Sequence, residues 1–298
     1  MDLEDILLKK IATEVDLHKP IHILLCFANP ETLKALTLVA ERFISVEPRK
    51  STITALHLIR KDDVAKIENM DAYKNEVFSE LFAMSEANNI LVRAFVEPSE
   101  NYVQTILQMA EKHENNFVLG GVKHRSFNTS LWIKYKELKS KPNNTPQFIE
   151  TQFEPGTAFA MDTISSLFQV NPRATAMLSD EGLSDIHYIF VPLLDPDDVH
   201  IFLYIYLIAQ KEGVRLMLWD ALGMIKSHPS AKKLFQFICK KAAGKVRLWD
   251  EDKKIEYDFI NMQDLVMVGG NSWEKLMSSA ISWNHMLPST LIIKDKKI

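Results

Sequence analysis

Two pairs of adjacent glycines are the residues in this chain best suited to holding a ligand. Gly120 and Gly121 follow one short apolar run, and Gly269 and Gly270 follow another. A glycine at the carboxyl end of a strand lets the backbone come close to a phosphate group, and a helix that starts there favours anions. The same pairs can also serve only to make a tight turn. Both interpretations of the glycines remain open from the sequence.

Polar residues accompany both glycine pairs. Asn29 and Asp195 each end an apolar run and each precede a proline, which is favoured in the first turn of a helix. Asp195 would commonly cap the helix that follows it. Both side chains would also face a ligand at the carboxyl ends of the strands. Lys123 and Ser272 follow the glycine pairs by two residues. The candidate ligand-binding residues are therefore Asn29, Gly120, Gly121, Lys123, Asp195, Gly269, Gly270 and Ser272.

The chain lacks the motifs by which common enzyme classes are recognised. Its 9 histidines are scattered, with no HExxH motif and no nucleophile elbow. The His-x-Gly-His signature of nucleotidyl transferases and the Ser-Gly-Gly-x-Asp-Ser loop of pyrophosphatases are also missing. Cys26 and Cys239 lie far apart in apolar segments, which suits reduced thiols in the cytosol and offers no CxxC metal or redox pair. We therefore predict a protein that binds without catalysis and without a metal.

The composition is that of a folded protein with two domains. The chain has 298 residues, of which 47% are hydrophobic and 25% charged, and its formal net charge is −4. At roughly 150 residues per domain, this length predicts two buried cores. The longest wholly apolar run, 201–209, is about half of the ~20 residues that a membrane-spanning helix needs. Acidic residues near the start, where a signal peptide is positively charged, favour a cytoplasmic protein.

Apolar periodicity in the first half alternates short strands with longer helices. Continuous apolar strands that are linked by helices predict a parallel sheet covered on both faces. The expected strands are 21–27, 52–59, 90–96 and 117–119, and the expected helices are 31–44, 72–87 and 102–113.

The second half repeats short segments of the first half in the same order. The Ile-His pair at 21–22 recurs at 186–187, and the Pro-Gly-Thr-x4-Asp pattern that ends at Asp162 recurs as Pro-Ser-Thr-x4-Asp, ending at Asp295. We therefore predict two tandem α/β units, each a five-stranded parallel sheet with helices on both faces and with fifth strands at 157–162 and 290–295. The expected segments are a connector helix at 1–19, domain 1 at 20–162, a linker at 163–185 and a shortened domain 2 at 186–298.

Three motifs carry a family resemblance: the segment from Ile23 to Leu36, the Val-Leu-Gly-Gly turn at Val118 and the Pro-(Gly/Ser)-Thr-x4-Asp pattern. Together they resemble a Rossmann-like universal stress protein unit. The tandem arrangement is more specifically similar to the cytosolic C-terminal tail of bacterial sodium/proton antiporters of the cation:proton antiporter-2 family. This resemblance implies a non-catalytic regulatory domain that senses a ligand, pH or a partner at the inner face of the cell membrane. The implied partner is a membrane antiporter domain, covalently attached or separate.

A free-standing tandem universal stress protein that binds an adenine nucleotide is the alternative. Nucleotide-binding members of that family resemble one another in an Asp after the first strand and in a Gly-x2-Gly-x9-Gly-(Ser/Thr) loop after the fourth. Here Asn29 follows the first strand, and Lys123 and Ser272 stand where the second glycine of the loop is expected. A side chain at that position keeps the backbone away from a phosphate. We therefore predict no cofactor, with an adenine nucleotide as the alternative ligand.

An apolar segment and a pair of histidines also suggest how the two units pack and what they sense. The segment 197–211 is apolar around its whole circumference, so we expect it to pack between the two units or across a homodimer. We expect this helix and the helix at 31–44, or the edge strands beside them, to form the contact between the units. The predicted oligomeric state is a homodimer. His22 and His187 occupy matched positions, as a pH-sensing pair or as ordinary strand-end residues.

Two basic stretches, 123–141 and 226–247, could contact the inner leaflet of a membrane or form solvated faces. The net negative charge, with no basic motif interleaved with aromatic residues, excludes nucleic acid as a partner.

Overall fold

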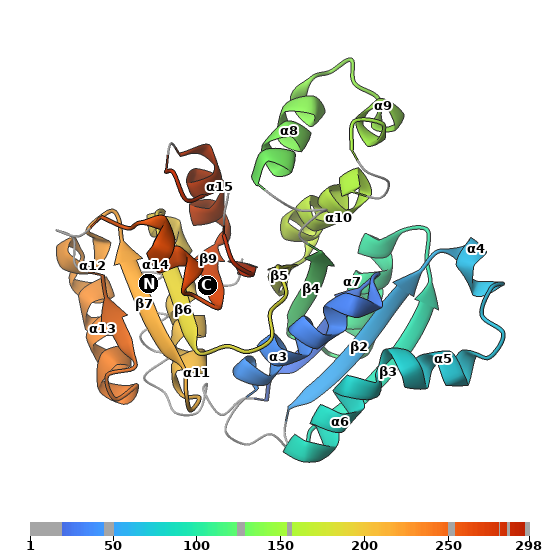
Figure 1. Cartoon of the computed structure of the whole chain (residues 1–298), viewed down its shortest axis with the longest axis horizontal. Helices are drawn as coiled ribbons and strands as arrows, with labels where there is room; N and C mark the ends of the chain where they lie inside the picture. Colours follow the sequence, from blue (N-terminus) through green and yellow to red (C-terminus); the bar gives the residue numbers. More distant parts are fainter. Residues whose placement is uncertain are drawn as a thin grey trace.

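The computed structural model describes residues 20–44, 51–123, 129–153, 157–249, 254–279, 281–284 and 287–295. Their strands form one sheet with the order β3-β2-β1-β4-β5-β10-β9-β6-β7-β8 (Figure 1). Neighbouring strands are parallel except β5 and β10, which are antiparallel. The strands are β1 (His22–Phe27), β2 (Thr52–Ile59), β3 (Leu91–Pro98), β4 (Phe117–Lys123), β5 (Ala174–Asp180), β6 (Tyr188–Leu193), β7 (Arg215–Asp220), β8 (Val246–Leu248), β9 (Leu265–Gly269) and β10 (Thr290–Lys294).

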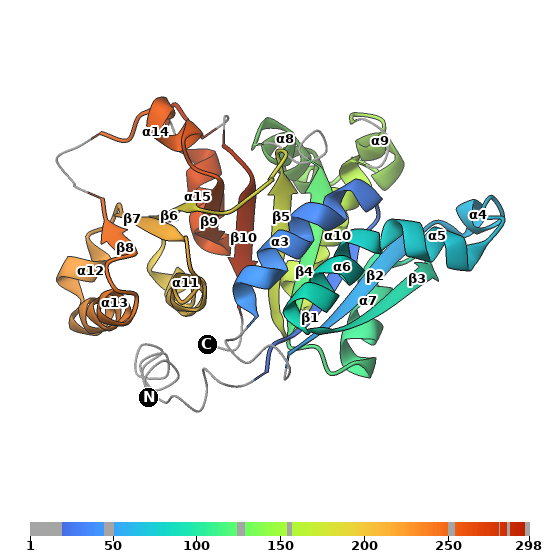
Figure 2. The same ribbon diagram turned by 60° about the horizontal axis from the view of Figure 1, so that its bottom comes forward.

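Helices cover both faces of the sheet, as Figure 2 shows. Because successive side chains of a strand point to opposite faces, Ile23 and Leu25 enter one core while Leu24 and Cys26 enter the other. The first core lies under α3 (Leu33–Phe43), α6 (Ser79–Asn88), α11 (Ile201–Ala209) and α13 (Pro229–Lys241). The second core lies under α7 (Tyr102–Lys112), α8 (Thr129–Ser140), α9 (Pro146–Glu150), α10 (Thr157–Val170), α14 (Tyr257–Asn261) and α15 (Gly270–Ser278).

Short helical turns complete the described elements. They are η1 (Pro30–Thr32), α4 (Lys61–Val64), α5 (Met70–Val77), η4 (Pro196–Asp198) and α12 (Met224–Ser227). Within the described residues, no helix is both long and apolar enough to cross a lipid bilayer.

The prediction of two separate five-stranded sheets is wrong. The chain forms one continuous sheet, because β5 and β10 pair with each other and Met177 lies opposite Ile292. Pairing these two strands satisfies backbone groups that would otherwise remain at two exposed sheet edges. The first half (β1–β5) has the order β3-β2-β1-β4-β5, and the second half (β6–β10) has the corresponding order β8-β7-β6-β9-β10. The strands of the first half run antiparallel to those of the second half, because β5 and β10 run in opposite directions. The carboxyl ends of the strands in the first half therefore lie on the opposite side of the sheet from those in the second half.

The fifth strand of the first half is also not where the sequence predicts it. The segment 157–162 is the start of helix α10, and the fifth strand is β5, within the segment 163–185 that was predicted to be a linker. Met161, Ile164 and Leu167 are buried at helical spacing, and Asn171 and a proline then end the helix. The chain passes from the first half to the second through residues 181–187. The predicted connector helix at 1–19 lies outside the described residues.

Helices α3 and α11 join the two halves on one face of the sheet. Their contact is centred on Phe43 and Tyr204, whose ring centroids are 5.8 Å apart. The Tyr204 hydroxyl donates a hydrogen bond to Oδ2 of Asp295, 3.0 Å away. Seven of the nine residues of α11 are buried. The prediction that this apolar helix packs against the helix after the first strand is therefore confirmed.

Candidate ligand pocket

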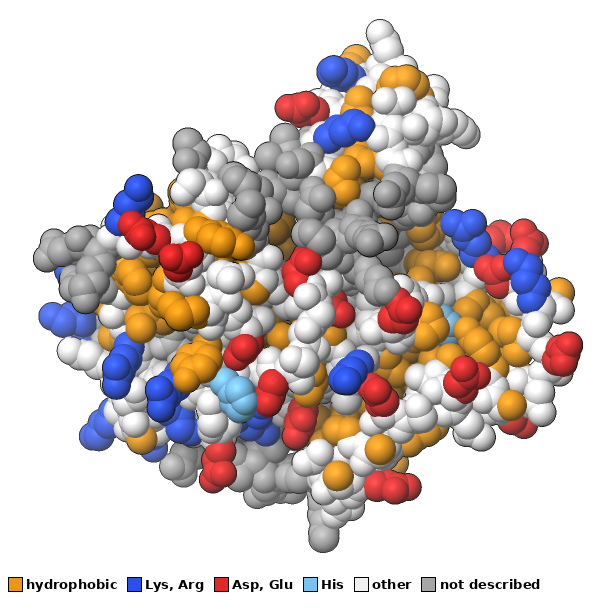
Figure 3. All heavy atoms as spheres, viewed as in Figure 1, with side chains coloured by type: hydrophobic (Ala, Val, Ile, Leu, Met, Phe, Trp, Pro, Cys, Tyr) orange, Lys and Arg blue, Asp and Glu red, His pale blue; other side chains and the backbone are white. Residues whose placement is uncertain are grey.

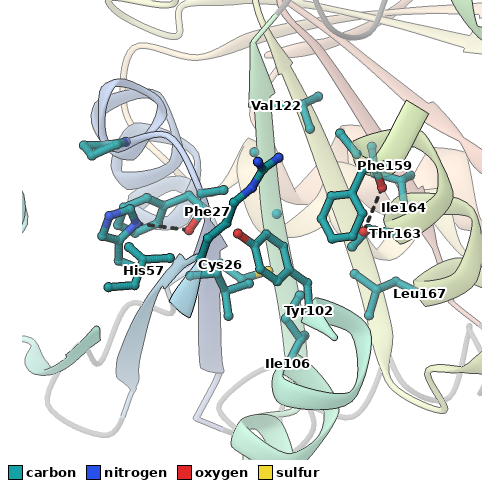
Figure 4. Close-up of a pocket in the computed structure, with 18 of the residues that line it drawn as sticks. Cys26, Phe27, His57, Tyr102, Ile106, Val122, Phe159, Thr163, Ile164 and Leu167 are labelled. Carbon is teal, nitrogen blue, oxygen red and sulfur yellow. Dashed lines mark hydrogen bonds between the residues drawn. The ribbon is translucent and has the colours of Figure 1, made fainter. Parts of the chain in front are cut away.

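A pocket of about 430 Å³ opens in the first half, at the carboxyl ends of β1, β2 and β4 (Figure 4). Helices α7 and α10 form its outer wall. The strand order reverses between β1 and β4, and ligands in open α/β sheets bind in the crevice at this kind of reversal. The volume falls within the range of small-molecule sites. This pocket is the candidate site of the chain.

Most of the pocket wall is apolar. Ile106 of α7, Leu167 of α10 and Met177 of β5 form part of its lining. The rings of Tyr102 and Phe159 meet edge to face between α7 and α10, with centroids 5.0 Å apart (Figure 4). An apolar wall favours a ligand with a substantial apolar or aromatic part, because moving that part out of water into the pocket lowers the free energy.

His57 of β2 is the buried polar group of the pocket. Its ring stacks on Phe27 with a centroid distance of 5.0 Å, and its Nδ1 lies 3.3 Å from the carbonyl oxygen of Phe27. Its Nε2 lies 2.9 Å from the hydroxyl of Tyr73. Burial lowers the pKa of His57, so the neutral ring is favoured. Because a carbonyl only accepts, Nδ1 carries the proton and Nε2 accepts from Tyr73.

Charged groups also line the pocket, next to His57. Arg60 and Asp63 both contribute to the lining. The Lys66 ammonium donates to Asp63 at 2.6 Å, and this hydrogen bond lowers the pKa of the Asp63 carboxyl. The lining thus combines an apolar wall with one guanidinium, one carboxylate and a neutral imidazole.

Gly120 and Gly121 line this pocket, but they do not form a turn after a strand. Strand β4 continues through both residues to Lys123. A Cβ atom at Gly120 would lie 2.7 Å from Cε of Met177, and one at Gly121 would lie 3.0 Å from Leu36. The glycines therefore make room for side chains of β5 and α3. Their backbone is packed against protein and is not an open cradle for a phosphate.

The other two candidates of the first half lie near the pocket. Asn29 lies between two lining residues and caps η1, since its side chain accepts from the amide of Glu31 at 3.1 Å. Lys123 ends β4, two residues after Gly121.

The candidates of the second half meet at the N-terminus of α15, where a carboxylate of the chain itself is bound. Asp198 of η4 accepts from the backbone amide of Ser272 at 2.5 Å and from that of Asn271 at 3.3 Å. Its side chain is buried against Gly269, where a Cβ atom would collide with it. Burial raises the pKa of this carboxyl. The amides at which the sequence predicts an external anion therefore already hold Asp198.

The remaining residues of this cluster are also bonded within the protein. The Ser272 hydroxyl accepts from the amide of Leu194 at 3.0 Å. Asp195 caps η4 by accepting from the amide of Asp197 at 2.8 Å, and it forms an ion pair with Lys275 at 3.0 Å. Gly270 begins α15. The predicted residues thus form two groups at opposite edges of the sheet and do not converge on one site.

The two histidines in matched positions each have a local partner. His22 begins β1, and its Nδ1 lies 2.7 Å from the hydroxyl of Thr52. His187 precedes β6, and its Nε2 lies 2.9 Å from Asp185. Their role in pH sensing stays a prediction. No cluster of three or more His, Cys, Asp or Glu suited to a metal ion occurs in the described part of the chain.

Two solved structures align with most of this chain. The cytoplasmic domain of a prokaryotic cation chloride cotransporter aligns with a TM-score of 0.50 and 12% identity, covering 93% of this chain and 96% of that one. The chain shares its fold with that cytoplasmic domain. A universal stress protein from Archaeoglobus fulgidus DSM 4304 aligns with a TM-score of 0.47 and 12% identity, covering 91% of this chain and 97% of that one. No family model and no curated protein matches the sequence.

Proposed function

We propose that this chain is the cytoplasmic regulatory domain of a bacterial sodium/proton antiporter, attached to the membrane domain or encoded separately. One observation carries the proposal: a transporter's cytoplasmic domain has the same fold over 93% of this chain. The corresponding strand orders of the halves support descent from a duplicated universal stress protein-like unit. The domain acts by binding, and no bond is made or broken in it.

The proposed ligand site is the pocket of the first half, with one ligand per chain. The second half needs no ligand at the corresponding place, because Asp198 already holds the amides of α15. The pocket is linked to the contact between the halves through α3: Gly121 in the pocket wall packs against Leu36 of α3, and Phe43 of the same helix contacts Tyr204. A ligand that displaces α3 therefore changes the packing of α11. This differential packing is the proposed signal to the transporter.

The alternative function is that of a free-standing universal stress protein that binds an adenine nucleotide. The observation in its favour is a pocket of about 430 Å³ at the reversal of strand order, which has room for a nucleoside. Two features oppose it: Met177 and Leu36 occupy the space beside Gly120 and Gly121, and most of the wall is apolar. Calorimetry with ATP and with AMP tests this alternative. Tight binding of ATP, weakened by Arg60→Ala, supports an adenine nucleotide as the ligand of this pocket.

The proposed function is tested by locating the chain in its native cells. An antibody against residues 20–298 is used on the cytosol and on membranes washed with alkaline carbonate, which removes peripheral proteins. An attached regulatory domain stays in the washed membranes, and a separately encoded one is released by the wash. Recovery from the cytosol alone, with a bound nucleotide, contradicts the proposal. The predicted homodimer is tested by light scattering of the purified chain.

A further inference from the structure

Helix α13 presents a row of lysines away from the sheet. Its buried side chains, Ala231, Leu234 and Ile238, pack into the core. Lys232, Lys233, Lys240 and Lys241 are exposed, and we call these four residues the basic face. None of their ammonium groups pairs with a carboxylate of a described residue.

No acidic residue offsets this charge along the chain nearby. Between Asp220 and Asp250 the sequence contains no Asp or Glu. Asp220 itself is buried, and its carboxylate accepts from the amides of Met224 and Ile225 at 2.9 and 2.6 Å. Exposed Lys226 and Arg247 add further positive charge in the same segment. The basic face is therefore strongly positive on a protein whose formal net charge is −4.

The other lysine-rich stretch, 123–141, differs, because three of its lysines bind acceptors within the protein. The Lys134 ammonium donates to the carbonyl of Gln152 at 2.7 Å. Lys136 pairs with Glu274 of α15 at 3.8 Å, and Lys139 pairs with Asp162. Lys123 ends β4, and residues 124–128 lie outside the described residues. Internal contacts thus engage Lys134, Lys136 and Lys139, whereas on the basic face only Lys241 has such a contact with a described residue, with its Nζ 5.9 Å from the ring centroid of Phe237.

The position of α13 suits contact with an extended surface. Figures 1 and 2 place α12 and α13 at one end of the molecule, with α4 and α5 at the opposite end. Lysine and arginine side chains gather over that end in the space-filling view (Figure 3). We propose that the basic face docks on the anionic phospholipid headgroups of the inner leaflet. This inference rests on the proposed function, since a regulatory domain of a membrane transporter works beside that leaflet, and Lys residues near such a surface are attracted to it.

The experiment is co-sedimentation of the purified chain with vesicles. One set is phosphatidylcholine alone, and the other contains phosphatidylglycerol as well. The test variant is Lys232→Glu/Lys233→Glu/Lys240→Glu. The matched control is Lys34→Glu/Lys112→Glu/Lys141→Glu, which changes the same number of exposed lysines on α3, on α7 and just after α8. Thermal unfolding by circular dichroism shows that both variants are folded.

We expect binding to the anionic vesicles only. The test variant binds at least about 100-fold more weakly, because each lysine at the surface contributes about 1 kcal/mol, and the control binds like the wild type. Raising the salt from about 0.1 M to 1 M shortens the screening length from about 10 Å to 3 Å and releases the chain. Equal binding by the two variants, or no binding by the wild type, overturns the proposal. So does release by inorganic phosphate or by a short RNA at unchanged ionic strength.

Failure of this proposal is distinguishable from failure of the proposed function. If the chain affects transport but does not bind anionic vesicles, only the proposed docking on phospholipids is wrong. If the chain binds the vesicles through α13 but has no effect on transport, the proposed regulatory function is wrong.

Discussion

The ring of Tyr204 lies edge-on against the ring of Phe43, with an interplanar angle of 89° and a centroid distance of 5.8 Å. The two residues belong to different halves of the chain, and both are buried. This contact and the pairing of β5 and β10 are two places where the halves pack against each other. It also lies at the end of the proposed path from the pocket to the second half.

Removing one of these rings should weaken the whole molecule. We expect Phe43→Ala to lower the free energy of unfolding by about 3–5 kcal/mol, because it removes a buried ring and leaves a cavity. Urea unfolding followed by circular dichroism measures this change. The control is Phe148→Ala, whose side chain is 46% exposed, with an expected effect within about 0.5 kcal/mol. Equal midpoints for the two variants would show that the contact between the halves adds no stability.

The two glycines at the start of α15 should respond differently to the same substitution. A Cβ atom at Gly269 collides with Asp198, whereas one at Gly270 meets only the side chain of Lys294, at 3.5 Å. We expect Gly269→Ala to lower the free energy of unfolding by about 1–3 kcal/mol, through overpacking and loss of the buried hydrogen bonds of Asp198. Gly270→Ala should be neutral or stabilising. Thermal unfolding of both variants tests this, and a tolerated Gly269→Ala would contradict the position of Asp198.

The buried imidazole of His57 makes stability depend on pH. Burial holds its pKa below the ordinary value of 6.5, so the unfolded chain takes up the proton more readily than the folded chain. The stabilisation is therefore fully present above pH 6.5 and is lost as the pH falls below it toward the folded pKa.

We expect the melting temperature of the wild type to fall between pH 7 and pH 5 by more than that of His57→Gln. Some pH dependence should remain in the variant, because burial also lowers the pKa of His113. Thermal melts of both proteins across this range are the measurement. Identical pH profiles would mean that His57 is not kept neutral by the fold.

Filling the pocket should abolish the binding of apolar probes. Thr163 of α10 lines the pocket, and a tryptophan at this position occupies part of its volume. We expect the fluorescence of anilinonaphthalene sulfonate with the wild type to fall at least about tenfold with Thr163→Trp, since the probe loses its apolar site. Thr151→Trp, at an exposed position, is the control. Unchanged fluorescence with the pocket variant would place the probe elsewhere.

Much of the framework follows from local patterns in the sequence. Strand β2 has the bounds that its β-branched run predicts, and the wholly apolar segment around Ile205 lies between the halves as expected. These predictions succeed because hydrophobic periodicity reports burial directly. The match to 290–295 predicts a fifth strand at 157–162, but Met161, Ile164 and Leu167 are buried at helical spacing and this segment begins helix α10.

The site could be predicted only in part, because long-range packing decides it. The sequence indicates Gly120 as a candidate, but it does not show that Met177, from a strand far along the chain, fills the space beside it. Nor does it show that Asp198 reaches the amides of α15. His57 was missed, although a histidine within an apolar strand was the one signal that could have indicated it. Tyr102 and Phe159 lie in helices, where an aromatic residue usually packs in the core, so the sequence does not indicate that they line the pocket.

The regulatory role is tested most directly by cation/proton exchange in everted membrane vesicles from the native organism. One strain lacks the coding region for residues 1–298, a second carries the intact chain, and a third carries Phe43→Ala at a temperature where that variant is folded. The collapse of a preformed pH gradient on adding Na⁺ is followed with a fluorescent amine. We expect that deletion changes the rate or the pH dependence of exchange, that the intact chain restores both and that Phe43→Ala restores them only in part. Superimposable exchange curves from all three strains would contradict the regulatory role.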